Sequence, residues 1–193
     1  MSEQTTFWGK IKQNLNSLTT IFQRDKNAPL ALPQPSNPKY RITNDIRIIQ
    51  SKGEEITLYR IQALRDFVWR SPLNSEESVI LHVKKGDFGG FIQSEANLSI
   101  EGRAWISENA MAYGSAIVKD NALLTGNACV TDYAQIIGNA LVKDTAIIKD
   151  EAIIRDNAII AGAILVRDNV LVGSDIYVYG SSSKTLTGQR QYV

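Results

Sequence analysis

The distribution of apolar residues from Arg103 to Gly180 follows one period of six without interruption. Alanine opens each hexad from Ala104 to Ala158, and Ile164, Val170 and Ile176 continue the same column. A second apolar column lies two residues later in every hexad: Ile106, Ala112, Val118, Leu124, Val130, Ile136, Val142, Ile148, Ile154, Ile160, Val166, Val172 and Val178. Self-similarity at a fixed period predicts a repeat architecture.

Each hexad combines a short strand with a corner. Residues two apart on an extended strand point to the same face, so the two columns predict one apolar face per strand. Two positions further on, Asp or Gly recurs, as at Asp120 and Gly126, and Asn often follows, as at Asn121. These residues turn the chain and tolerate left-handed backbone angles. The sequence therefore predicts an all-β fold, a parallel β-helix of hexapeptide repeats over residues 96–180, with both columns lining its bore.

Three hexads per coil would stack residues that are 18 apart in the sequence, at a spacing of about 4.8 Å. Asn121, Asn139 and Asn157 should then form a ladder of side-chain amides. The same spacing predicts a second ladder, made of like charges: Asp132, Asp150 and Asp168. Two interpretations of the acidic ladder remain open. Corner carboxylates that accept backbone hydrogen bonds are favoured over a surface calcium site, whose ligands would be the same oxygens.

The position between the two inward columns points outward, yet it is largely apolar. On one face five such residues stack: Trp105, Leu123, Leu141, Ile159 and Tyr177. A solvated monomer rarely exposes an apolar stripe of this length. We expect another protomer or the N-terminal segment of the chain to cover it, and a cyclic homo-oligomer is favoured.

The N-terminal residues predict an amphipathic helix within residues 1–24, because apolar side chains recur there at spacings of three and four. These residues are Phe7, Trp8, Ile11, Leu15, Leu18, Ile21 and Phe22. Three roles remain open for the helix: packing on the prism or on a neighbour, pairing with copies of itself, or lying in a membrane surface. The first is favoured. The membrane role is the least favoured, since only Lys10 and Lys12 lie near the start of the helix.

The remaining segments are accessory to the repeats. Residues 25–39 contain four prolines among small and polar residues, which predicts an extended tether. Residues 40–95 predict short strands separated by Gly-containing turns. The first coil of a β-helix exposes unpaired edge groups, and we expect this β segment to cap them. Residues 181–193 form a short polar tail.

Motifs in the cap and at the start of the repeats resemble those of a known family. They are Tyr59-Arg60-Ile61-Gln62-Ala63-Leu64-Arg65-Asp66-Phe67, Lys85-Gly86-Asp87-Phe88-Gly89-Gly90-Phe91, Asn97-Leu98-Ser99 and Glu101-Gly102. In this order they are similar to the YdcK-like bacterial hexapeptide-repeat proteins, which are often prophage-associated and some of which are labelled acyltransferases. The resemblance covers residues 40–180. It implies a left-handed parallel β-helix and a homotrimer, and it carries no assigned reaction.

Composition narrows the function classes. The length of 193 residues suits one repeat domain with accessory segments, and a net charge of +1 provides no global attraction to nucleic acid. The sequence shows no cleavable signal peptide and no membrane-spanning run, so a cytoplasmic location is expected.

One residue is a candidate for catalysis. His82 is the single histidine, and a CoA-dependent hexapeptide acyltransferase would need a general base close to its thioester. His82 precedes the repeats in an apolar strand, where a structural role is favoured. The frame from Ala104 to Val178 never slips, so no loop is available to cover a substrate. The sequence therefore favours a non-enzymatic oligomeric scaffold or interaction protein without a cofactor, whose N-terminal helix engages a protein partner. The alternative is the acyl-CoA-dependent acyltransferase.

Overall fold

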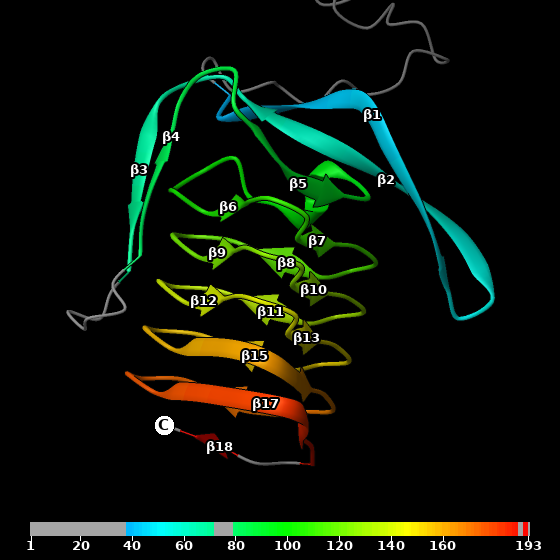
Figure 1. Cartoon of the computed structure of the whole chain (residues 1–193), viewed down its shortest axis with the longest axis vertical. Coiled ribbons are helices and arrows are strands. Elements are labelled where there is room, and N and C mark those ends of the chain that lie inside the picture. The colour runs from blue at the N-terminus through cyan, green and yellow to red at the C-terminus, as the bar shows by residue number, and fades with distance from the viewer. Residues whose placement is uncertain (1–37, 72–78, 189–190, 193) are drawn as a thin grey trace, which may run out of the picture. The chain divides into compact units, whose positions relative to one another are not determined.

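The structure is a computed structural model that describes residues 38–71, 79–188 and 191–192. The predicted N-terminal helix and its apolar residues, from Phe7 to Phe22, lie outside the described residues. The described chain is all-β, with a parallel β-solenoid joined to two antiparallel hairpins (Figure 1).

Short strands separated by corners make up the solenoid, as the hexads predict. They are β6 (Trp105–Ile106), β7 (Met111–Ala112), β8 (Ile117–Val118), β9 (Leu123–Leu124), β10 (Cys129–Val130), β11 (Gln135–Ile136), β12 (Leu141–Val142), β13 (Ile147–Ile148), β14 (Ile153–Ile154), β15 (Ile159–Val166), β16 (Leu171–Val172), β17 (Tyr177–Leu186) and β18 (Gln191–Tyr192). The longer strands β15 and β17 each continue around one corner.

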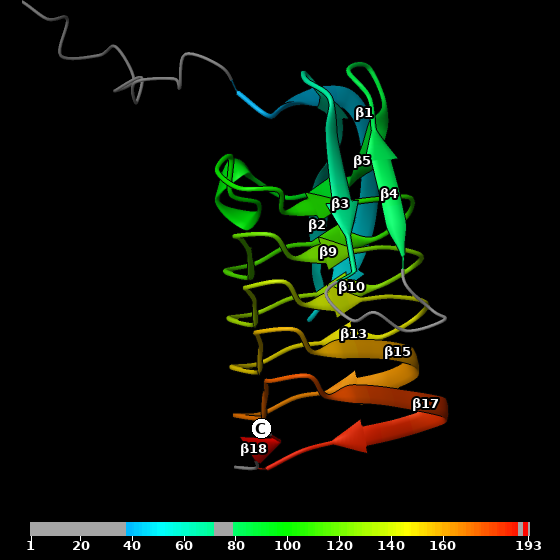
Figure 2. The same cartoon turned by 90° about the vertical axis from the view of Figure 1, so that its left-hand side faces the viewer.

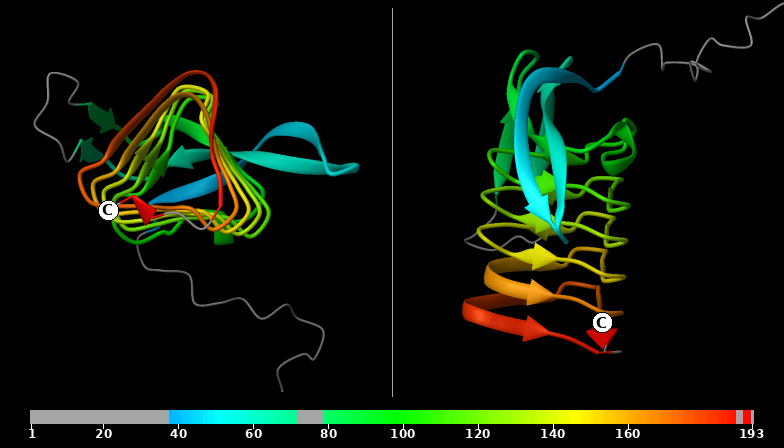
Figure 3. Two further views of the ribbon diagram at one scale, coloured as in Figure 1. Left: turned by 90° about the horizontal axis from the view of Figure 1, so that it is seen from below. Right: turned by 90° about the vertical axis from the view of Figure 1, so that its right-hand side faces the viewer.

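Three walls enclose the bore. Wall A consists of β6, β9, β12 and the first parts of β15 and β17, whereas wall B contains β7, β10, β13 and the later parts of β15 and β17. Wall C consists of β8, β11, β14, β16 and β18. Leu123 pairs with Leu141, and Cys129 pairs with Ile147, so residues 18 apart are in register. The prediction of three hexads per coil is confirmed, and the view along the axis is triangular (Figure 3).

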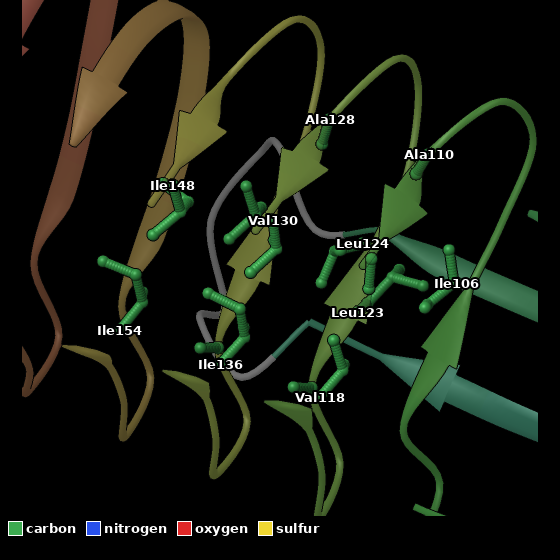
Figure 4. Close-up of a cluster of buried hydrophobic side chains, with 14 of the residues drawn as sticks. Ile106, Ala110, Val118, Leu123, Leu124, Ala128, Val130, Ile136, Ile148 and Ile154 are labelled. Carbon is green, nitrogen blue, oxygen red and sulfur yellow. The ribbon is translucent and has the colours of Figure 1, made fainter. Parts of the chain in front are cut away.

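The bore is filled by the two apolar columns. The ten alanines of the first column, from Ala104 to Ala158, have no exposed surface, and neither have Val130, Ile136 and Ile148 of the second column (Figure 4). One small and one large side chain per wall fill the narrow interior. Each large aliphatic residue buried in this way contributes about 1.5–3 kcal/mol of transfer free energy.

The backbone angles at the corners explain why this position is occupied by either Asp or Gly. Asp120, Asp150 and Gly126 have φ angles of 61°, 58° and 71°, which lie in the left-handed region. Gly tolerates this region without strain, and Asp is one of the few other residues that enter it. A Cβ on Gly126 would also lie 2.8 Å from the carbonyl oxygen of Asp144, one coil on. At this corner, therefore, only glycine fits.

The first hairpin continues into the solenoid. Strands β1 (Tyr40–Ser51) and β2 (Glu54–Ala63) are antiparallel, and β2 pairs with β5 (Phe88–Ile92). Strand β5 is antiparallel to β2 but parallel to β7, so it is where the chain enters the coil. The short 3-10 helix η1 (Glu95–Asn97) follows it.

Several side chains near this junction satisfy carbonyls of the first coil. The Lys39 ammonium donates to the carbonyl oxygen of Ala104 at 2.6 Å, and the Tyr40 hydroxyl donates to that of Leu98 at 2.7 Å. The Asn97 amide donates to the carbonyls of Gly114 and Ala116 at 3.0 and 2.9 Å. At this irregular first turn, these side chains supply hydrogen bonds that backbone N–H groups supply in the following coils.

A second hairpin, β3 (Phe67–Arg70) and β4 (Ile80–Val83), lies along wall A beside the upper coils (Figure 2). The Trp69 side chain is buried and its indole N–H donates to the carbonyl of Asn121, which fixes the hairpin to the second coil.

Parallel pairing continues beyond Gly180, where the hexad pattern ends. Gly162 pairs with Gly180, which is 18 residues later, but Ile164 pairs with Lys184, which is 20 residues later. A register shift of two residues separates these pairs. The residues predicted as a polar tail therefore supply the end of β17 and all of β18, which pairs with β16.

Candidate interaction surface

The outward-facing residues form one row on each wall. Row A contains Trp105, Leu123, Leu141, Ile159 and Tyr177. Row B contains Phe91, Met111, Cys129, Ile147, Leu165 and Thr185. Row C contains Ile117, Gln135, Ile153, Leu171 and Gln191. How much of each row remains exposed determines which walls are open to a partner.

Row A is buried apart from its last member. Trp105, Leu123, Leu141 and Ile159 are at most 4% exposed, whereas Tyr177 is 45% exposed. The second hairpin contacts the top of the row, where the Phe67 ring meets the Trp105 ring edge-on with centroids 5.3 Å apart. Row A was predicted to be covered by another protomer or by the N-terminal segment, but the structure places hairpin β3–β4 against its upper end. Exposed apolar side chains are found instead on rows B and C.

Row B changes from covered to open along the axis. Phe91 is 3% exposed, Met111 and Cys129 are half-buried, and Ile147 is 41% exposed. The first hairpin accounts for the covered part, because it descends beside the upper coils (Figure 3, right). Below its tip, a hollow of about 270 Å³ is lined by Thr145, Ile147, Ala163, Ile164, Leu165 and Thr185.

Contacts along the first hairpin hold it against wall B. The Arg47 guanidinium lies 3.9 Å from the centre of the Phe91 ring and donates to the carbonyl and the side-chain oxygen of Asn109. At the tip, the Lys52 ammonium lies 2.5 Å from a carboxylate oxygen of Asp132. Partial burial acts to raise the pKa of Asp132, but hydrogen bonds from Lys52 and from the Asp150 backbone, together with the Lys52 charge, leave this pKa below its usual value.

Wall C, which carries row C, is open to solvent. Ile117 is 38% exposed, and Ile153 and Leu171 are half-buried. Beside the row, Tyr133 is 66% exposed and lines a hollow of about 320 Å³ with Gln135, Glu151 and Ile153. Wall C therefore presents aliphatic and aromatic surface to solvent over several coils.

His82 does not lie in a cleft with other acid–base groups. It is exposed on β4, opposite Val68, on the outer hairpin rather than on a solenoid wall. Among the described residues it makes no hydrogen bond or ion pair. The alternative catalytic role of His82, which the sequence did not favour, therefore has no geometric support among the described residues.

The acidic ladder is assembled as predicted, and its carboxylates serve as backbone acceptors. The N–H of Asp150 donates to Asp132 at 3.3 Å, that of Asp168 donates to Asp150 at 3.1 Å, and that of Gly188 donates to Asp168 at 3.0 Å. Thr187 also donates its hydroxyl to Asp168. Within the described ranges, no group of three or more His, Cys, Asp and Glu residues could hold a metal ion.

The amide ladder is confirmed directly. Asn121 donates its side-chain amide to Asn139 at 3.1 Å, and Asn139 donates to Asn157 at 3.0 Å. Asn157 then donates to Asp175 at 2.8 Å, so a carboxylate terminates the ladder. Each amide lies one coil from the next, which stabilises one corner of the prism.

Two features, one at the first coil and one on wall B, could not be predicted from the sequence. The Lys39 side chain is buried although it lies in the segment predicted as a tether, and the tip of the first hairpin contacts a residue 80 positions away. Alternation at Ile46-Arg47-Ile48 would have indicated the wrong inward face of β1, because Ile46 and Ile48 are exposed and Arg47 contacts the solenoid.

Comparisons with known proteins add no family to this description. No family model matches the sequence, and no curated protein is similar enough to count as a relative. The similarity to YdcK-like proteins thus remains a prediction from the motifs. In the parts of the chain that the structure describes, no helix has the length and apolar character needed to cross a membrane.

Proposed function

We propose that this protein is a non-enzymatic oligomeric scaffold or interaction protein, built on a left-handed β-helix and assembled as a homotrimer. The observation that carries the proposal is the exposed apolar surface on two solenoid walls: Ile117 on row C, Tyr133 beside that row, and Ile147 on row B. These residues sit on a rigid, regular support, where a partner surface needs no rearrangement to bind. Burial of such surface is the main favourable term in protein association.

The mass of the full-length protein in solution tests the assembly. We expect a mass three times the 21.4 kDa of one chain. Ile153→Lys on wall C and Ile147→Lys on wall B place a charge in the proposed interfaces, and at least one should yield monomers. Ile48→Lys is the matched control, because Ile48 is 54% exposed but lies on the outer face of the first hairpin. A monomeric parent protein, or a mass that no wall variant changes, would contradict the proposal.

The N-terminal segment is proposed to engage a partner or another protomer. Deletion of residues 1–37 tests this role without removing Lys39, which the structure places in the first coil junction. If the helix pairs with copies of itself, the truncated protein should lose mass beyond the deleted residues. If it only contacts a foreign partner, the truncated protein keeps the oligomeric state of the full chain.

The acyltransferase alternative requires its own measurement. Acyl-CoA turnover by the full-length protein, followed by the same assay on His82→Ala, would support it if activity is present and then lost. His82 lines neither of the two wall hollows, so neither hollow would hold a substrate beside this residue.

A further inference from the structure

The end of the first hairpin is attached to the solenoid differently from its base. Strand β2 pairs with β5 only from Tyr59 to Gln62, and β1 pairs only with β2. From Ile46 to Thr57 the two strands therefore share backbone hydrogen bonds with each other and with no other described strand. We name this part, residues 46–57, the strap.

One face of the strap rests on wall B. Arg47 contacts Asn109 and Phe91, and the Ser51 side chain lies close to Tyr113. Because side chains alternate along a strand, Ile49 lies on this same inward face, between those two contacts. On the opposite face Ile46 and Ile48 are 50% and 54% exposed. The strap thus has a solenoid-facing side and a solvent-facing side.

The polar contacts that close the strap lie in exposed settings. The Lys52 side chain keeps 74% of its surface in solvent while it pairs with Asp132. Arg47 donates to Asn109 at 3.2 and 3.3 Å, also in an exposed setting. Exposed ion pairs contribute little to stability, and salt weakens them. The strap is therefore held far less firmly than the base of the hairpin.

We propose that the strap is a detachable cover for the upper part of row B. Its closed position coincides with the change in exposure along the row, since Met111 and Cys129 are half-buried and Ile147, beyond the tip, is 41% exposed. Release of Lys52 from Asp132 and of Arg47 from Asn109 joins the covered residues to the open hollow below. Row B then becomes one continuous apolar surface, while the hairpin base and the solenoid stay folded.

The single cysteine of the chain reports on this motion. Cys129 belongs to row B, and the Tyr113 side chain lies close to both Cys129 and Ser51 at the strap tip. The experiment measures the rate at which a maleimide modifies Cys129 in the full-length protein at fixed pH. Burial raises the pKa of the Cys129 thiol, and the Asp132 charge adds to this effect. Lys52→Met leaves that charge unpaired, which acts to slow labelling, so faster labelling reports exposure of Cys129. Lys119→Met, at an exposed position outside row B and the strap, is the matched control.

We expect Lys52→Met to accelerate labelling about two- to five-fold at low salt, as an exposed ion pair predicts. Sodium chloride at about 1 M should accelerate the parent protein similarly and have less effect on Lys52→Met. Lys119→Met should label like the parent. Equal labelling rates for Lys52→Met and the parent protein at low salt would overturn the proposal.

A second variant separates strap release from unfolding of the whole domain. Val172→Ala removes buried volume from β16, far from the strap along the solenoid, and should lower the denaturation midpoint. If the strap opens locally, Val172→Ala leaves the labelling rate unchanged, whereas Lys52→Met raises the rate with little change in midpoint. Labelling that follows the midpoint in both variants would show global unfolding instead and would also overturn the proposal.

Discussion

The backbone N–H of Asp168 donates to the carboxylate of Asp150, one coil before it, at 3.1 Å. Both residues have left-handed φ angles, 60° and 58°. The same bond recurs at other corners, where Gly138 donates to Asp120 and Gly162 donates to Asp144. The corner carboxylate therefore has two roles: its residue tolerates the left-handed turn, and its oxygen satisfies the N–H of the corresponding corner in the next coil.

Asp150→Ala should lower the free energy of unfolding by about 2 kcal/mol. The substitution removes one hydrogen bond and places alanine in the left-handed region, which costs roughly 1–2 kcal/mol on its own. Asp150→Asn is the matched control, since Asn tolerates this backbone angle and keeps an acceptor oxygen. Denaturant titration followed by circular dichroism measures both. Equal losses for the two variants would contradict the double role.

The amide ladder predicts that the loss of stability on Asn→Ala substitution depends on the position in the ladder. Asn139 both accepts from Asn121 and donates to Asn157, so Asn139→Ala leaves two neighbours without a partner. We expect a loss of about 1–2 kcal/mol in the free energy of unfolding. In the ladder Asn121 only donates, and Asn121→Ala should cost about half as much. The same denaturant titration distinguishes them, and a larger loss for Asn121→Ala would count against a cooperative ladder.

The repeat could be predicted from the sequence because its information is local and periodic. Each hexad states which residues face the bore and which turn the chain, so the three walls, the register and both corner ladders follow from spacing alone. The last coil shows the limit of this reasoning. Beyond Gly180 the register shifts by two residues, and the segment that ends in Leu186 no longer follows the frame.

The coverage of the walls could not be predicted, because it depends on contacts between segments that do not repeat. Trp69 reaches Asn121 across 52 residues, and Lys52 reaches Asp132 across 80. Nothing in the spacing of row A indicates that a hairpin preceding the repeats folds back over it. The sequence correctly identified an apolar row that needs cover, but it could not identify which segment supplies the cover.

The bore predicts a steric limit at the alanine column. Ala140 has no exposed surface and stacks between Ala122 and Ala158 in neighbouring coils. Ala140→Leu adds three carbon atoms to a filled interior and should cost about 3 kcal/mol or more, because neighbouring side chains must leave their preferred rotamers. Gln135→Leu places leucine at an outward position, where the side chain meets no filled interior, and should stay within about 0.5 kcal/mol. Comparable denaturation midpoints for the two variants would contradict the assignment of inward and outward positions.

Lys39 predicts a pH dependence that opposes the usual alkaline loss of stability. Burial, with a smaller contribution from the Arg65 charge, lowers the pKa of the Lys39 ammonium from 10.5 to about 7. Between these two values the unfolded chain binds more protons at this site than the folded one. The penalty for burying the charge is thus fully present below about pH 7, and it decreases as the pH rises towards 10.5. Its size is on the order of 3–5 kcal/mol, reduced by the hydrogen bonds that the ammonium donates to the carbonyls of Ala104 and Glu101.

Lys39→Met removes the titration, so the stability of the parent protein relative to this variant should increase from pH 7 to pH 10. Denaturant titrations of both proteins across this range isolate Lys39 from the other groups that titrate there. Parallel pH profiles for the two proteins would show that the ammonium remains charged in the fold.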